Sequence, residues 1–182
     1  MRGHDIDTDR ILPARFLLAV TFDGLEAHLF EDDRRSNPHH PFSDPRYAGA
    51  AILLVNRHFG CGSSREHAPQ AIVRRGIRAV VGESFSEIFF GNAVALGLPC
   101  LTIGSGEIEA LMTAAEHAPG TALTIDIRDL TVAMSGLTMP AAMPPAAQAA
   151  FLGGVWDATA LLLEHGDRVR AVSASLPYIS GF

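Results

Sequence analysis

The sequence predicts a single α/β domain built on parallel strands, with a helical carboxyl-terminal segment. Three apolar segments of strand length, 50–55, 78–82 and 98–103, are each followed by a segment with helical patterning. Strands that alternate with helices at such short spacing are typical of β-α-β units, whose neighbouring strands run parallel. The chain has 182 residues, 48% of them hydrophobic, which suits one domain with a substantial core. We therefore expect residues 1–182 to form one domain.

Local signals assign the individual elements in chain order. The first fifty residues are rich in Asp, Arg, His and Pro, and their polar stretch 31–46 is expected to be a long, mobile surface loop. The expected elements that follow are a strand at 50–55, a helix at about 65–75 closed by Gly76, a strand at 78–82, a helix from a Ser84–Glu87 capping box to about 96, a strand at 98–103, a helix at 107–117, paired strands at 121–127 and 130–134, and a helical tail at about 144–182.

Charge and composition exclude several classes of function. Fourteen basic against twenty acidic residues give a net charge of −6 and a pI of about 5.7, whereas nucleic-acid binding normally needs a basic excess. All fourteen basic residues are arginine, which excludes a Schiff-base lysine, a covalent pyridoxal site and the lysine of a P-loop. No uninterrupted apolar run reaches the roughly 18 residues of a membrane helix, and no signal-peptide pattern is visible, so we expect no membrane segment.

The cysteine content bears on metal binding and on cellular location. Cys61 and Cys100 are too few for a zinc or iron–sulfur site, and they lack C-x-x-C spacing. Reduced thiols and a cytoplasmic location are the expectation. Any metal chemistry would need ligands from a partner chain.

The segment Gly60-Cys61-Gly62-Ser63-Ser64-Arg65-Glu66-His67 is the strongest sign of chemistry in the sequence. It joins a buried strand to a helix, which is where open α/β sheets commonly bind ligands. Two glycines allow a sharp turn and a close approach of the backbone to a ligand. Hydroxyls and amides at a helix N-terminus favour an anion, and Arg65 adds a planar donor suited to a carboxylate. The pattern indicates a site for a small carboxylate or phosphate compound.

Structural roles would also account for each of these residues. Ser63 and Glu66 fit a capping box, although Pro69 then lies beyond the first helical turn unless the regular helix starts near Ala68. Arg65 alone could form a surface ion pair, and His67 alone could pack in the core. The G-x-S-x-G pattern of serine hydrolases is absent around Ser63.

A second polar cluster precedes Pro13 in the segment Asp5-Ile6-Asp7-Thr8-Asp9. Its three aspartates would project to one side if the segment were extended. The alternative is an Asx-type turn formed by at least one of them. A calcium loop of the EF-hand type is not supported, because its glycine and later glutamate are absent.

Together the two clusters identify a family resemblance. The acidic segment 5–9 and the segment 59–69 resemble the small-subunit family of 3-isopropylmalate dehydratase, the swivelling domain of the aconitase superfamily. The resemblance is dense from about residue 3 to residue 103 and implies a swivelling β/β/α domain with a mixed or parallel sheet flanked by helices. Further matching residues are Phe30, Asp44-Pro45-Arg46-Tyr47, Gly49, Ser84-Phe85-Ser86-Glu87-Ile88-Phe89, Gly91-Asn92 and Gly97-Leu98-Pro99.

The resemblance assigns roles to individual residues. Ser63 corresponds to the general base, which takes a proton from the carbon next to a carboxylate. Ser64 and Arg65 correspond to positions that bind the substrate carboxylate, and Thr8 is expected to contribute to binding or to shape the turn. Asp9 corresponds to an aspartate that pairs with a histidine of the catalytic partner.

The resemblance also implies the reaction and a partner. The relatives carry a [4Fe-4S] cluster on the large subunit, where it acts as a Lewis acid, so this chain alone is expected to bind no cofactor or metal. A heterodimer would interconvert 2-isopropylmalate and 3-isopropylmalate in leucine biosynthesis. The alternatives are the same hydro-lyase chemistry on a related 2-hydroxy dicarboxylate such as citramalate or dimethylmalate, an anion-binding module that has lost its partner, and a hydrolase that uses Ser63.

One segment departs from bacterial relatives, which usually carry basic residues and Arg-Thr-Gly there. Here the residues Leu18, Ala19, Val20 and Thr21 are mostly apolar. In this superfamily the region lies near the variable γ-group of the substrate, so an apolar stretch would suit an alkyl group and disfavour a third carboxylate. The alternative is that these residues pack in the core or at the subunit interface.

Overall fold

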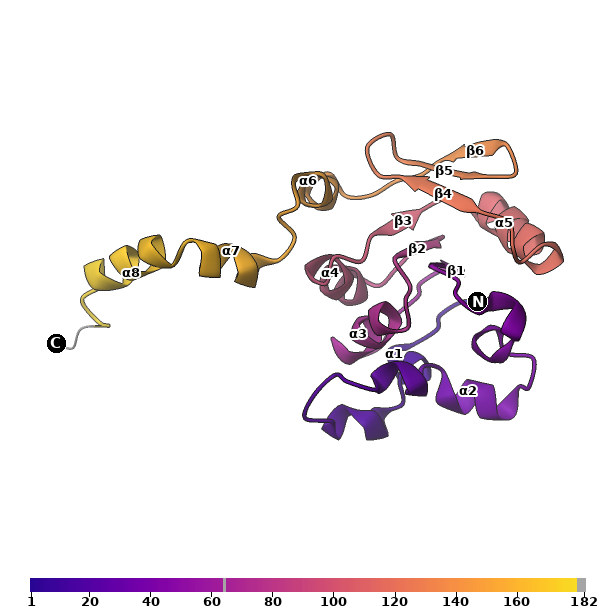
Figure 1. Cartoon of the computed structure of the whole chain (residues 1–182), viewed down its shortest axis with the longest axis horizontal. Coiled ribbons are helices and arrows are strands. Elements are labelled where there is room, and N and C mark those ends of the chain that lie inside the picture. The colour runs from indigo at the N-terminus through magenta and orange to yellow at the C-terminus, as the bar shows by residue number, and fades with distance from the viewer. Residues whose placement is uncertain (64, 180–182) are drawn as a thin grey trace.

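Three parallel strands form the centre of the computed structural model, which describes residues 1–63 and 65–179 (Figure 1). They are β1 (Ile52–Val55), β2 (Ala79–Gly82) and β3 (Cys100–Thr102), in the spatial order β1-β2-β3. Helices α3 (His67–Arg74) and α4 (Glu87–Ala95) make the two crossovers. The predicted β-α-β arrangement is confirmed.

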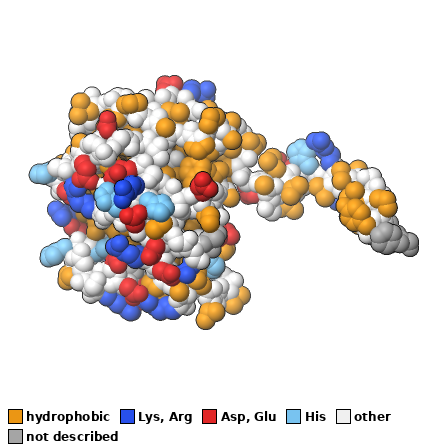
Figure 2. Space-filling view, turned by 180° about the vertical axis from the view of Figure 1, so that it is seen from behind, with side chains coloured by type: hydrophobic (Ala, Val, Ile, Leu, Met, Phe, Trp, Pro, Cys, Tyr) orange, Lys and Arg blue, Asp and Glu red, His pale blue; other side chains and the backbone are white. Residues whose placement is uncertain are grey.

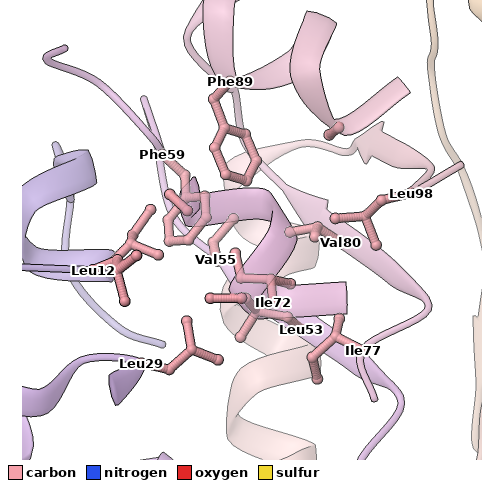
Figure 3. Packing of buried hydrophobic residues seen from close by; sticks show 14 of the residues in the cluster. Leu12, Leu29, Leu53, Val55, Phe59, Ile72, Ile77, Val80, Phe89 and Leu98 are labelled. Atoms are coloured by element: carbon pink, nitrogen blue, oxygen red, sulfur yellow. The ribbon is translucent and has the colours of Figure 1, made fainter. Parts of the chain in front are cut away.

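Apolar residues on both faces of this sheet build two cores. Leu53, Val55 and Val80 pack toward α3 and α4, together with Ile72 and Phe89, as the labelled side chains of Figure 3 show. The strand residues that alternate with these, such as Leu54 in β1 and Val81 in β2, pack on the other face of the sheet with α5 (Ser105–His117). A parallel sheet covered on both faces requires continuous apolar strands, which is why these segments were recognisable in the sequence.

A second sheet covers α5 and the far side of the first sheet. Strand β4 (Leu123–Asp126) pairs antiparallel with β5 (Thr131–Met134), as predicted, and β5 pairs with β6 (Leu137–Pro140). Strand β6 was not predicted, because its residues are mostly exposed and it ends in Pro140. Proline is tolerated there because β6 lies at the sheet edge.

The stretch predicted as a loop at 31–46 is instead largely helical. Helix α2 covers Glu31–Ser36, and two short 3₁₀ turns follow at Pro41–Ser43 and Pro45–Tyr47. Three acidic residues occupy the first turn of α2 and two arginines the last, an order that complements the helix dipole. The prediction was wrong because a highly polar stretch is typical of irregular structure, whereas the position of these charges favours a helix.

The start of α4 also differs from the prediction. Its N-cap is Ser86, whose Oγ accepts a hydrogen bond from the Phe89 amide at 3.3 Å, so Ser84 does not cap the helix. The Ser84 hydroxyl oxygen instead accepts a hydrogen bond from the His58 amide at 2.8 Å. The Ser86 amide donates to the Phe59 carbonyl at 3.0 Å, so both serines contact the segment that follows β1.

The tail is helical, as expected, and leaves the body of the molecule (Figure 1). Helices α6 (Pro145–Gly153), α7 (Ala158–Glu164) and α8 (Gly166–Ser175) follow one another, and Trp156 lies over Gly97 at the end of α4. Figure 2 shows hydrophobic side chains along this tail. Leu163 and Val172 are exposed. Within residues 1–63 and 65–179, no single helix is long and apolar enough to cross a membrane, although α6 and α7 together pass that test with a bend of 47° between them.

Candidate active site

The segment after β1 lies between two other parts of the chain, which hold it from both sides. On one side the Gly60 amide donates to the Ile6 carbonyl at 2.8 Å, and the Thr8 amide donates to the Cys61 carbonyl at 2.9 Å. On the other side Ser86 Oγ donates to the Gly60 carbonyl at 2.5 Å. The two polar clusters of the sequence therefore lie next to each other, although more than fifty residues separate them.

Gly60 is required at the start of this loop. Its φ of +75° is unfavourable for other residues, and a Cβ at this position would overlap the ring of Phe89. Phe89 is buried and makes an edge-to-face contact with Phe59 at 5.1 Å between ring centroids. The glycine therefore lets the loop backbone lie directly on the aromatic core of Figure 3.

Replacing Gly60 by alanine is expected to lower the free energy of unfolding by about 2–4 kcal/mol, through backbone strain of about 1–2 kcal/mol plus overpacking against Phe89. Chemical denaturation would measure the change. Gly136→Ala is the matched control, because Gly136 has a φ of +81° but no atom within 4 Å of its would-be Cβ. A loss no larger than that of the control would contradict the packing role of Gly60.

Ser63 is exposed and stands four residues before the first residue of α3. Helix α3 begins at His67, its N-cap is Glu66, and no side chain caps it, so the capping-box alternative for Ser63 is wrong. The helix predicted from about residue 65 thus begins two residues later. Pro69 falls in the first turn, where a proline is tolerated. The neighbouring Ser64 lies outside the described residues.

Arg65 joins the two clusters through its side chain. Its guanidinium forms two hydrogen bonds with the Asp9 carboxylate, one of them Nη2 to Oδ2 at 3.1 Å. The Arg65 side chain is 14% exposed and that of Asp9 is 53% exposed, so the arginine is held in the protein while the carboxylate faces solvent. This two-pronged arrangement is the one by which arginine also binds a free carboxylate.

The acidic segment is not extended, so its three aspartates do not project to one side. Asp7 caps the short helix α1 (Thr8–Ile11) by accepting a hydrogen bond from the Arg10 amide at 2.7 Å, which confirms the Asx-turn alternative. Asp5 has a φ of +54° and contacts His58 Nδ1 at 2.9 Å. That contact and nearby Arg57 lower the pKa of the Asp5 carboxyl. Of the three aspartates, Asp9 is the one that contacts Arg65.

Thr8 is buried, with 2% of its surface exposed, and its hydroxyl donates to the Ser63 carbonyl at 3.0 Å. The predicted substrate contact of Thr8 stays a prediction. Ser86, which was not among the predicted site residues, holds the same loop. The closely spaced serines in Ser84-Phe85-Ser86 are the sequence signal that could have drawn attention to it.

Comparison with known proteins matches this chain to one family. The sequence model for the aconitase C-terminal domain matches residues 4–105, which contain both clusters. The 3-isopropylmalate dehydratase small subunit of Synechocystis sp. is 47% identical over 97% of this chain and 89% of the relative, and that of Thermus thermophilus is 48% identical over 98% and 90%.

The chain belongs to the 3-isopropylmalate dehydratase small-subunit family. A solved structure of 3-isopropylmalate dehydratase from Methanocaldococcus jannaschii supports this at the level of the fold, with a TM-score of 0.69 and 25% identity over 92% of this chain and 95% of the other. The expected aconitase-type α/β fold is thereby confirmed.

The segment 18–21, predicted to lie near the variable group of the substrate, is exposed. Leu18 is 89% exposed and Val20 is 99% exposed, and Ala19 and Thr21 are exposed as well, so these residues do not pack in the core of the chain. The next residue, Phe22, makes an edge-to-face contact with His67, the first residue of α3, at 5.0 Å between ring centroids. His67 is two positions after Arg65 in the sequence, so this contact holds the end of the segment beside the part of the chain that carries Arg65.

The donor set of this small subunit does not fit an iron–sulfur cluster. Both cysteines are free thiols, and among the described residues no group of three or more His, Cys, Asp or Glu side chains could hold a metal ion. Burial raises the pKa of both thiols, and Asp7 and Asp5 raise that of Cys61 further. Neither cysteine is favoured as a thiolate ligand or nucleophile.

Proposed function

We propose that this chain is the small subunit of a 3-isopropylmalate dehydratase, a hydro-lyase that interconverts 2-isopropylmalate and 3-isopropylmalate through isopropylmaleate. The observation that carries the proposal is the side-by-side placement of the acidic segment and the loop after β1, linked by Arg65 and Asp9. A module that only bound anions would not need this link together with an exposed Ser63.

In the proposed reaction, Ser63 acts as the general base for the carbon next to a substrate carboxylate. A serine hydroxyl is an intrinsically weak acid, so its alkoxide needs preorganised positive charge in a site from which water is excluded. Arg65 supplies such a charge two residues away along the chain, and the N-terminus of α3 adds to it. Ser63 is exposed in this chain, and docking of the large subunit is proposed to cover it.

Arg65 is the proposed anchor for a substrate carboxylate, with Ser64 beside it. The guanidinium is largely buried and lies in a fixed position, which suits a planar, two-point interaction. Asp9 is proposed to pair with a histidine of the large subunit in the complex and so to tune an acid for the departing hydroxyl. Its half-exposed carboxylate can be reached by a partner chain.

The large subunit is the proposed partner because the site is incomplete without it. The residues described here supply a base, an anchor and an aspartate, but no cluster ligands. We expect the [4Fe-4S] cluster, and the Lewis acidity that it provides, on the large subunit. A cytoplasmic location is also proposed, supported by the two free thiols and by the biosynthetic class of the relatives.

The exposed and mostly apolar segment 18–21 is proposed to contact the alkyl group of the substrate through Leu18, Ala19, Val20 and Thr21. The Phe22–His67 contact supports this proposal, because it keeps the segment close to Arg65. A charged third carboxylate would be poorly solvated against such a surface. The same surface would also accept the smaller alkyl groups of citramalate and dimethylmalate.

The proposal is tested by co-expressing this chain with its large subunit, purifying the complex anaerobically, and assaying 2-isopropylmalate, citramalate, dimethylmalate and the unsaturated tricarboxylate homoaconitate. We expect turnover of 2-isopropylmalate, with kcat/KM for homoaconitate lower by about 100-fold or more. Once the large subunit covers the site, the third carboxylate would be buried against residues 18–21 without a partner, which costs several kcal/mol. The isolated chain serves as the control and should be inactive.

Two outcomes would count against the proposal in different ways. Failure of the two chains to co-purify, or an inactive but cluster-loaded complex, would contradict the enzyme assignment. Preference for a tricarboxylate would leave that assignment standing and contradict the alkyl-binding role of residues 18–21. Ester hydrolysis by the isolated chain would instead revive the hydrolase alternative.

A further inference from the structure

We propose that Thr8 is a positioning residue for Ser63, and that its buried hydroxyl orients the serine by holding the Ser63 carbonyl. This inference rests on the proposed role of Ser63 as base. It assigns to Thr8 a function that differs from direct substrate binding.

The backbone hydrogen bonds beside the loop show which backbone donor the Thr8 hydroxyl replaces. The Gly60 amide donates to the Ile6 carbonyl, and the Thr8 amide donates to the Cys61 carbonyl. These two bonds between the acidic segment and the loop resemble those of a short parallel β-ladder. The next donor of such a ladder would come two residues further on and would meet the Ser63 carbonyl.

The backbone cannot supply that next donor. The chain turns into α1 at Thr8, and the Arg10 amide donates to the Asp7 carboxylate at 2.7 Å instead. The Thr8 hydroxyl takes its place and donates to the Ser63 carbonyl at 3.0 Å. A side chain thus extends the ladder by one bond, to the residue proposed to do the chemistry.

This bond matters because, among the residues that the structure describes, few other backbone contacts orient Ser63. The preceding Gly62 has a φ of +88°, and a glycine leaves the backbone free to adopt many conformations. Ser86 holds the loop at the carbonyls of Phe59 and Gly60, three or more residues earlier. Thr8, by contrast, is 2% exposed and β-branched, so its hydroxyl is shielded from water and restricted in rotation.

The hydrogen bond of the Thr8 hydroxyl distinguishes a role in positioning Ser63 from a role in binding substrate. A threonine hydroxyl has one hydrogen to donate, and here Ser63 O receives it. Removing the hydroxyl should therefore misplace the base without removing a contact to substrate. Misplacing a catalytic group lowers kcat, whereas loss of a ground-state contact raises KM.

The test compares Thr8→Val with Thr8→Ser in the complex with the large subunit. Thr8→Val removes the hydroxyl at nearly constant volume, and we expect kcat to fall about tenfold while KM changes less than twofold. Thr8→Ser keeps the hydroxyl and should retain most of the activity. Thr102→Val is the matched control, because Thr102 Oγ1 also donates to a backbone carbonyl, that of Ala142, at 3.3 Å on β3.

Each outcome decides the proposal. A raised KM at unchanged kcat would assign Thr8 to substrate binding, and unchanged kinetics would remove any role; either result overturns positioning. If Thr8→Val does not assemble, Thr8→Ala is measured in its place. If neither variant folds while Thr102→Val does, Thr8 is only structural and the proposal fails. An inactive parent complex would instead refute the proposed function itself.

Discussion

Replacing Ser63 by alanine is expected to lower kcat of the reconstituted complex by about 100- to 10,000-fold, the usual contribution of a positioned general base. The protein should keep its stability, because Ser63 is exposed and does not cap α3. Steady-state kinetics on 2-isopropylmalate and thermal unfolding would measure the two quantities. The pairing of large catalytic loss with unchanged folding is what distinguishes a base from a structural serine.

The control for this experiment is Ser105→Ala, at an exposed serine in the first turn of α5 that does not serve as its cap. Its activity should equal that of the parent complex. Turnover by Ser63→Ala within a few-fold of the parent would remove Ser63 from the role of base. Loss of folding in that variant would show that the serine supports the loop instead.

Replacing Arg65 by lysine is expected to lower kcat/KM by roughly 10- to 100-fold. The variant keeps the positive charge but loses one of two charge-assisted hydrogen bonds to a carboxylate, each worth about 1.5–3 kcal/mol. The effect should appear mainly in KM, since the same contact exists before and during reaction. Kinetics and the affinity for a dicarboxylate inhibitor would measure it.

Arg170→Lys is the control for the arginine substitution. Arg170 pairs with Asp167 within α8, on the tail, and both side chains are largely exposed. That variant should leave kcat/KM unchanged. If Arg65→Lys lowers only the melting temperature, the contact with Asp9 is structural and the role of Arg65 as carboxylate anchor is contradicted.

Periodicity and glycine placement predicted much of the fold. The three parallel strands carry continuous apolar runs because the sheet is covered on both faces, so each was visible as a segment. The errors fell where local composition misleads. Helix α2 looked like a loop because it is polar throughout, and β6 was missed because most of its residues are exposed.

The candidate site was predicted as a set of residues but not as an arrangement. Ser63, Arg65 and Asp9 stood out by their motifs and by family resemblance, whereas the contact between Arg65 and Asp9 depends on residues 56 positions apart. The roles of Thr8 and Ser86 were also hidden, because each acts through a hydrogen bond to a distant backbone carbonyl.

Residue type and spacing along the chain were enough to establish the parallel α/β architecture, the shortage of cysteines for a cluster and the identity of the chemical groups near the loop. These are local properties, so they can be read without knowing the fold. Which groups face one another became clear only from the packed chain: Arg65 meets Asp9, and Thr8 rather than a backbone amide supports Ser63. Such pairings depend on how strands and turns far apart in the chain pack together, and a buried hydroxyl finds its partner only once that packing exists.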